Sequence, residues 1–501
     1  MVGLEQIFQI HTLLALAGGV IFGLFWGALP GLSTSMVMAL LVGISAIFPL
    51  PLGVAFLLGV YVGSTSGGEM TAVLINIPGT PDALPLTIEG YPLTKRGEGP
   101  LALGMAYVAS FLGGWIGILF LILLVPLVIK VALRFSSWEM ALLGLWGVVI
   151  AGNLTSGERP IKGWISGWLG LLVSMVGREM IYGYNRFTFG SAELVEGIDY
   201  IPVLIGLFGL AEVARVLSVR EQVSVHATIS RIIPPWSMVK RYWKAAVRGS
   251  LIGALIGAIP GAGANVATYV SYDIAKRTAP PDEREKFGQG SYEGIVAAEV
   301  ADNANIGGSL LPTLTLGIPG SAPAAAFMAS LTLLGIRVGP LINRDHPGFL
   351  YYIYGVLILA NFIMYGFALL MVKPAVRLFS LPRELLMPII SVICVVGAFE
   401  LNLSMFDVGT MFAFGIVGFL LQRFGFPLAP MVLGAILGPM VDENLRRTLV
   451  LYENRPILEL FTRPIGIALL ILILFTLYDG VFRAGKVRKV RLPLEAVRGE
   501  H

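Results

Sequence analysis

Two short stretches, Gly27-Ala28-Leu29-Pro30-Gly31 and Gly257-Ala258-Ile259-Pro260-Gly261, share one pattern and lie in opposite halves of the chain. Each lies inside an uncharged run, since residues 6–68 and 249–272 contain no Asp, Glu, Lys or Arg. Proline removes a backbone donor and glycine tolerates tight turns, so a Pro-Gly pair interrupts a helix. The two stretches therefore predict a pair of broken helices.

Three further landmarks recur in the same order. They are Gly67-Gly68 with Gly307-Gly308, Ile77-Pro78-Gly79-Thr80 with Ile318-Pro319-Gly320-Ser321, and Gly99-Pro100-Leu101 with Gly339-Pro340-Leu341. Their spacing is nearly constant, and a charged insertion around Lys276–Lys286 accounts for the one change in spacing. We infer an internal repeat.

The composition excludes a water-soluble globule. Of 501 residues, 56% are apolar before the 61 glycines are counted, only 13% are charged, and the mean hydropathy is +0.81. At about 20 residues a crossing, the apolar runs predict an all-α polytopic membrane protein with roughly 10–12 transmembrane helices. No basic region precedes the first run, so we expect a resident helix there instead of a signal peptide. One cysteine and four histidines leave no Cys- or His-based metal site, and a net charge of +4 gives no reason to expect nucleic acid binding.

The charge pattern divides the chain into two transmembrane halves. We expect a first half over 1–214 (repeat core about 15–130), a basic interfacial linker over 215–248, a second half over 249–482 (repeat core about 249–375) and a basic tail over 483–501. The positive-inside rule places the linker and tail in the cytoplasm and the N-terminus outside. The two copies then cross the bilayer in opposite senses. Inverted repeats with broken helices are typical of secondary transporters, which bind substrate near the midplane.

Small polar residues beside unwound backbone suit a carboxylate, because half-helix N-termini present N–H groups and a positive dipole end. The alternative is that small residues only allow helices to pack closely. The predicted substrate site consists of Pro30, Gly31, Ser33, Thr34, Ser35, Pro78, Gly79, Thr80, Pro260, Gly261, Asn265, Pro319, Gly320 and Ser321.

A second set of polar residues suits a coupling ion. Glu69 and Asp302 stand at the edges of long uncharged runs, and an ionisable group within a membrane is a functional hypothesis. The alternative is an interfacial position without a role. The coupling-ion candidates are Thr65, Ser66, Glu69, Asn76, Asp302, Asn303, Asn305 and Ser309.

The sequence contains no Walker A motif, no H-E-x-x-H and no G-x-S-x-G. We therefore expect no catalytic residue, no enzyme activity and no cofactor or metal other than Na+ or a proton as the coupling ion. Energy then comes from an ion gradient or from the gradient of the solute itself.

Taken together, several motifs resemble the large membrane subunit of tripartite tricarboxylate transporters, the TctA family. The motifs are Gly27–Ser33, Gly257–Asn265, Asn76–Asp82, Gly317–Ser321, Arg186–Gly190, Glu193–Asp199 and Pro202–Glu212, and the resemblance runs from about Leu14 to Asp479. It implies a permease of the bacterial inner membrane that works with a smaller membrane subunit and a periplasmic solute-binding protein. It also implies coupling to Na+ or protons and uptake of citrate or other organic carboxylates, with a homo-oligomer as an open alternative to a single copy.

Three other functions compete with this one. The first is a stand-alone carboxylate–cation symporter with the same two repeats. The second is a membrane-embedded, lipid-handling enzyme that uses Glu69 and Asp302, which the lack of a paired acid–base or metal constellation disfavours. The third is a passive channel, which paired broken helices disfavour.

Overall fold

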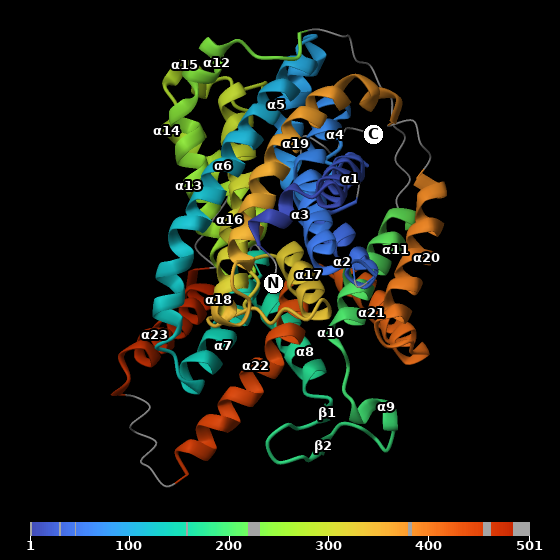
Figure 1. Cartoon of the computed structure of the whole chain (residues 1–501). Coiled ribbons are helices and arrows are strands. Elements are labelled where there is room, and N and C mark those ends of the chain that lie inside the picture. Colours follow the sequence, from blue (N-terminus) through green and yellow to red (C-terminus); the bar gives the residue numbers. More distant parts are fainter. Residues whose placement is uncertain are drawn as a thin grey trace.

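The computed structural model is helical apart from one small hairpin (Figure 1). It describes residues 3–29, 32–45, 47–156, 159–218, 231–378, 383–453 and 462–483. Within these ranges, 8 helices are long and apolar enough to cross a membrane, and three shorter apolar helices lie at Thr34–Ser45, Ala322–Leu333 and Met387–Asn402. The predicted all-α polytopic membrane protein is confirmed.

The first half begins with a short helix, followed by three membrane-length segments and the shorter elements between them. Its elements are η1 (Leu4–Phe8), α1 (Ile10–Gly27), α2 (Thr34–Ser45), α3 (Leu50–Gly67), α4 (Glu69–Ile75), η2 (Pro81–Ala83), α5 (Leu84–Lys95) and α6 (Gly99–Ala132). Two helices, the hairpin and an interrupted helix follow, as α7 (Ser137–Thr155), α8 (Pro160–Ser174), β1 (Gly177–Arg178), β2 (Asn185–Arg186), α9 (Ala192–Val195), α10 (Tyr200–Leu204), η3 (Ile205–Leu210) and α11 (Ala211–Ser218). The strands pair antiparallel, with Gly177 opposite Arg186.

The second half repeats the pattern of long helices and breaks. Its first elements are α12 (Trp236–Arg241), α13 (Trp243–Gly257), α14 (Gly263–Thr278), α15 (Pro281–Arg284), α16 (Tyr292–Leu316), α17 (Ala322–Leu333), α18 (Ile342–Asp345) and α19 (Phe349–Leu378). It continues with α20 (Arg383–Asn402), α21 (Met405–Arg423), α22 (Ala429–Leu451), α23 (Pro464–Tyr478) and η5 (Asp479–Arg483).

Glycine contacts repeat between the halves. Helix α1 packs along α3, and α13 packs along α16. A Cβ added to Gly27 would lie 2.3 Å from the Ser64 carbonyl oxygen, and one added to Gly257 would lie 2.7 Å from that of Asn305. Both helix pairs therefore pack backbone against backbone, as membrane helices with small interface residues do.

The second pair of breaks has the same local geometry in both halves. Helix α4 ends at Asn76 with φ 60°, and α16 ends at Gly317 with φ 69°. Ile77 N then donates to Thr71 O, and Ile318 N donates to Pro312 O, each at 3.3 Å. Equivalent backbone contacts at four equivalent positions support the internal repeat. The sense in which each copy crosses the membrane stays a prediction, as do the domain boundaries.

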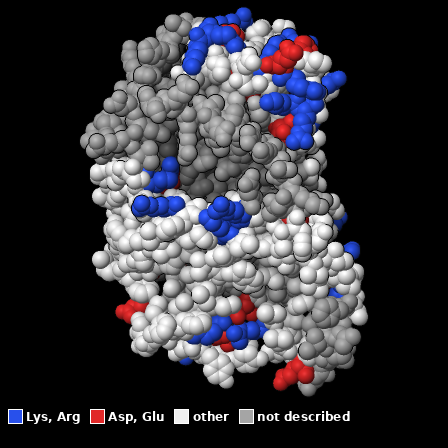
Figure 2. Space-filling view, turned by 180° about the vertical axis from the view of Figure 1, so that it is seen from behind, with Lys and Arg blue, Asp and Glu red and all other residues white. Residues whose placement is uncertain are grey.

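The outer surface suits a lipid environment. Leu119, Leu123 and Leu127 form an exposed stripe on α6, and Ile471, Leu474 and Phe475 are exposed on α23. Figure 2 shows charged side chains in the upper half of the view and a smaller group at the lower end, separated by a zone of uncharged surface. This arrangement is that of a helical bundle with an apolar belt.

The predicted linker and tail are only partly described. Arg215, the first residue of the predicted linker, lies in α11, and Arg248, its last, lies inside α13. Residues 219–230 and 484–501 lie outside the described residues.

Candidate functional site

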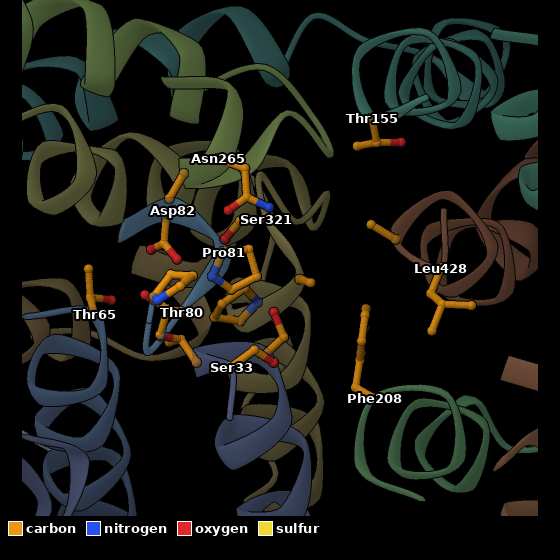
Figure 3. Close-up of a pocket in the computed structure, with 18 of the residues that line it drawn as sticks. Ser33, Thr65, Thr80, Pro81, Asp82, Thr155, Phe208, Asn265, Ser321 and Leu428 are labelled. Carbon is orange, nitrogen blue, oxygen red and sulfur yellow. The ribbon is translucent and has the colours of Figure 1, made fainter. Parts of the chain in front are cut away.

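One cavity of about 690 Å³ takes its lining from both halves of the chain. Its residues include Ser33, Thr34 and Ser35 from the first half and Gly261, Asn265 and Ser321 from the second. Figure 3 shows Ser33, Thr80, Asp82, Asn265 and Ser321 grouped on one side of it. The paired helix breaks thus meet around a single space.

Five helices of twelve or more residues begin at this cavity. The lining contains residues 33–35 at the start of α2, Thr80–Leu84 before α5, Gly261–Asn265 at the start of α14, Ser321–Pro323 at α17 and Leu428–Ala429 at α22. The first turn of each helix has N–H groups without intrahelical acceptors. Their aligned dipoles make the region favourable for negative charge.

Hydroxyl groups organise two of these helix starts. Ser33 Oγ accepts a hydrogen bond from Met36 N at 3.1 Å, and Ser321 Oγ accepts one from Ala324 N at 3.4 Å. The Tyr61 hydroxyl lies 3.0 Å from Ser321 Oγ, and Thr65 Oγ1 donates to the Tyr61 carbonyl at 2.9 Å. Tyr61 of α3 therefore ties the first half to the start of α17, while the Thr65 bond stays within α3.

The opposite wall comes from helices outside the repeat cores. Thr155 at the end of α7, Phe208 in η3 and Leu428 just before α22 face the polar group across the cavity (Figure 3). The segment η3 is a π-helix within the longer helix Tyr200–Ser218. Such π-helical turns are frequent at functional sites. The helix starts of the repeat cores thus bring small polar groups to one wall, while elements outside the repeat cores bring Phe208 and Leu428 together with polar residues such as Thr155.

Two acidic side chains, Asp82 and Asp302, also line the cavity, and both are at least nine-tenths buried. Their carboxyl groups interact with each other, while Asp302 Oδ1 and Thr80 Oγ1 are buried without a hydrogen-bond partner in the described structure. Arg215 lines the cavity too, but its Nε donates to Glu212 at 3.0 Å. Positive helix ends and negative carboxyls therefore share one space.

Most predicted site residues reach the cavity. Those that line it are Ser33, Thr34, Ser35, Thr65, Pro78, Gly79, Thr80, Gly261, Asn265, Asp302, Asn305 and Ser321. Those that do not are Ser66, Glu69, Asn76, Pro260, Asn303, Ser309, Pro319 and Gly320. Pro30 and Gly31 lie outside the described residues.

The predicted residues away from the cavity make contacts behind it. Ser66 Oγ donates to Asn303 Oδ1 at 2.9 Å, and Ser309 Oγ donates to Asn305 Oδ1 at 3.0 Å. Asn76 ends α4 in a left-handed conformation and is exposed. These side chains join α3 to α16 or shape the breaks; in this structure they do not line the cavity.

Sequence reasoning did not assign a role to Asp82, Tyr61, Arg215, Phe208 or Leu428. For Asp82, a signal existed, because it lies two residues after the Ile-Pro-Gly-Thr break. Phe208 lies inside the Pro202–Glu212 motif, but the motif does not show that this side chain reaches the cavity. No local signal marks Leu428, since its place at the cavity depends on how distant helices pack.

The helical fold and a cavity built from two sets of broken helices define a multi-pass membrane transport protein. The model of the tripartite tricarboxylate transporter TctA family matches residues 13–433, and the chain belongs to this family. Because this is a transporter family, the protein is not an enzyme.

Two proteins of Agrobacterium vitis are similar to the chain. An uncharacterized 52.8 kDa protein in the TAR-I ttuC' 3' region is 32% identical over 455 residues, which are 90% of this chain and 89% of that protein. An uncharacterized protein in the TAR-II ttuC' 3' region is 32% identical over 210 residues, covering 42% of this chain and 86% of that protein. No solved structure gives a significant match.

Proposed function

We propose that this chain is the large permease subunit of a tripartite secondary transporter that takes up a tricarboxylate or another organic carboxylate. A Na+ or proton gradient drives it, and a periplasmic solute-binding protein supplies the solute. The observation that carries the proposal is the convergence of five helix N-termini on one cavity. This arrangement attracts anions without needing an unpaired basic side chain.

The size of the cavity fits the proposal. About 690 Å³ lies within the usual range of roughly 300–1,000 Å³ for small-molecule sites. Hydroxyls and the amide of Asn265 provide donors to carboxylate oxygens, and Phe208 and Leu428 supply apolar contact. A small, multiply charged acid has matching groups on both walls.

The acidic pair gives a reason for coupling to a cation. A carboxylate substrate and ionised Asp82 and Asp302 would repel one another in a space where both aspartates are buried. A cation bound close to this wall would reduce the negative charge and so favour substrate binding. Substrate binding and cation binding would thereby be coupled, as symport requires.

The proposed setting is the bacterial inner membrane, with the N-terminus outside and the C-terminus in the cytoplasm. The proposed partners are a small membrane subunit and the solute-binding protein. Family membership supports the two partners, and the apolar helices support a location in a membrane. The proposed orientation of the termini rests on the positive-inside rule. A homo-oligomer is compatible with them.

The test is uptake of labelled citrate, followed by a panel of dicarboxylates, into proteoliposomes that contain this chain and its small subunit. We expect uptake that needs both the binding protein and an imposed Na+ or proton gradient. Asn265→Leu and Ser33→Leu fill the cavity with apolar bulk, so each should abolish uptake without loss of membrane insertion. Asn185→Leu, the same change as Asn265→Leu on the exposed hairpin, serves as the control.

Two results would contradict this proposal. Gradient-driven uptake without the binding protein identifies a stand-alone symporter. Wild-type uptake in well-inserted Asn265→Leu and Ser33→Leu variants would show that Asn265 and Ser33 do not belong to the substrate site.

A further inference from the structure

Two buried carboxyl groups behind the cavity meet at one serine. Ser110 Oγ of α6 lies 2.5 Å from Glu69 Oε1 of α4 and 3.1 Å from Glu299 Oε2 of α16. Relative exposure is 0% for Glu69 and Ser110 and 1% for Glu299. The contact joins three helices from both halves of the chain.

Counting hydrogens sets a minimum for the protons on this group. A serine hydroxyl carries one hydrogen and donates one hydrogen bond. Ser110 can therefore donate to one carboxyl group, and its contact with the other needs a hydrogen supplied by that carboxyl. One proton is enough to complete both contacts, in the order carboxyl, hydroxyl, carboxylate. The pair thus holds at least one proton.

Among the described residues, the titratable groups that interact with this pair are acidic or phenolic, and none is positively charged. Asp302 of α16 and Asp82 of η2 interact with it electrostatically, and both are acidic. Tyr107 of α6 faces both carboxyls, and its buried hydroxyl has no hydrogen-bond partner in the described structure. Glu69 Oε2 is likewise buried and unpartnered there. Losing the proton would leave buried charges uncompensated, which is costly.

The pair lies directly behind the cavity wall. Asp302, which lines the cavity, follows Glu299 by less than one helical turn. Gly68, next to Glu69, accepts a hydrogen bond from Gly79 N of the lining at 3.3 Å. A change of charge at the pair therefore acts on the wall that receives the substrate.

We propose that Glu69, Ser110 and Glu299 form the binding site of the coupling ion, and that this ion is a proton. The proton binds to a carboxylate oxygen from water on the outer side and leaves that oxygen to water on the inner side. Only an O–H bond forms and breaks. This inference rests on the proposed uptake function.

The experiment uses proteoliposomes with this chain, its small subunit and the binding protein. Labelled citrate is offered without Na+ under an imposed pH gradient, and citrate exchange at equal pH is measured beside it. Wild type should accumulate citrate. Glu69→Gln and Glu299→Gln should lose accumulation by about tenfold or more but keep exchange, because a fixed neutral amide mimics the loaded state. Glu193→Gln, on the exposed surface of α9, is the matched control and should keep both accumulation and exchange at the wild-type level.

A second readout does not depend on transport. The infrared spectrum of the purified complex at neutral pH should contain the carbonyl stretch of a protonated carboxyl, which the double Gln variant loses. Accumulation driven only by Na+, wild-type behaviour of both variants, or no such band in the wild type would overturn the proton site. Failure of the wild type to take up any carboxylate, with the band present, contradicts the uptake function alone.

Discussion

At the scale of single residues, two glycines hold the helix breaks against neighbouring helices. A Cβ added to Gly79 would lie 2.3 Å from Gly27 O, and one added to Gly320 would lie 2.3 Å from Gly257 O. Neither carbonyl can retreat easily, because it belongs to the last turn of a packed helix. The two Ile-Pro-Gly turns therefore pack against these helix ends only because these positions lack a side chain.

We expect Gly79→Ala and Gly320→Ala each to destabilise the protein by about 1–3 kcal/mol, the usual effect of overpacking. Gly18→Ala is the control, since a Cβ there meets nothing within 4 Å, and it should change stability by about 0.5 kcal/mol or less. Thermal unfolding in detergent measures all three. Equal melting temperatures would show that the turns can shift without cost.

At the scale of an element, the hairpin depends on α22. A two-stranded hairpin is marginally stable alone. Arg186 donates to both oxygens of Asp442, at 3.1 and 2.8 Å, and Arg446 Nε lies 3.8 Å from Glu179 Oε1. Burial alone would raise the pKa of Glu179, but N–H donation from Tyr182 and Ile181 and the charge of Arg446 lower it below its usual value. The hairpin is thus fixed by charge at two points.

Arg186→Lys should loosen the hairpin, because an ammonium cannot form the bidentate contact. Amide hydrogen exchange over residues 177–186 should become about fivefold faster, which corresponds to about 1 kcal/mol. Arg178→Lys, an exposed change on the partner strand, should have no effect.

The pH dependence of amide protection provides a second test of the contacts that hold the hairpin. A carboxyl whose pKa is lowered by folding stabilises the folded state at pH values above its unfolded pKa of 4.5. This stabilisation is lost as the pH falls through the lower pKa of the folded state. Protection of the hairpin should therefore persist at neutral pH and decline in acid below about pH 4.5. If the protection of the hairpin amides does not change with pH, the ionised Glu179 carboxylate does not stabilise the hairpin.

At the scale of the whole molecule, the sequence revealed one wall of the cavity better than the other. Pro-Gly pairs act on the local backbone, so the breaks around Pro260 and Pro319 were predictable, as was their recurrence. Thr155, Phe208 and Leu428 reach the cavity through packing between distant helices, which no local pattern encodes. The partner of Glu69 was missed for the same reason, although Glu299 lies three residues before Asp302 on one helix.

Because both halves line the cavity, one substrate molecule should protect both. In a Cys394→Ala background, which removes the single buried cysteine, Ser35→Cys and Asn265→Cys should each react with a polar thiol reagent. Citrate should slow both reactions. Gly18→Cys, on the outer surface of α1, should show no citrate effect. Protection confined to one half would mean that the substrate does not touch the other.

Binding of an anion by main-chain N–H groups does not depend on the identity of any particular side chain. Mutational drift around the five helix starts leaves the N–H groups in place, so the ability to hold a negative charge survives most substitutions. The side chains of Thr155 and Phe208 have no such protection, and changing them alters the shape of the opposite wall. A library randomised at these two positions is therefore a natural starting point for engineering a permease that accepts new solutes.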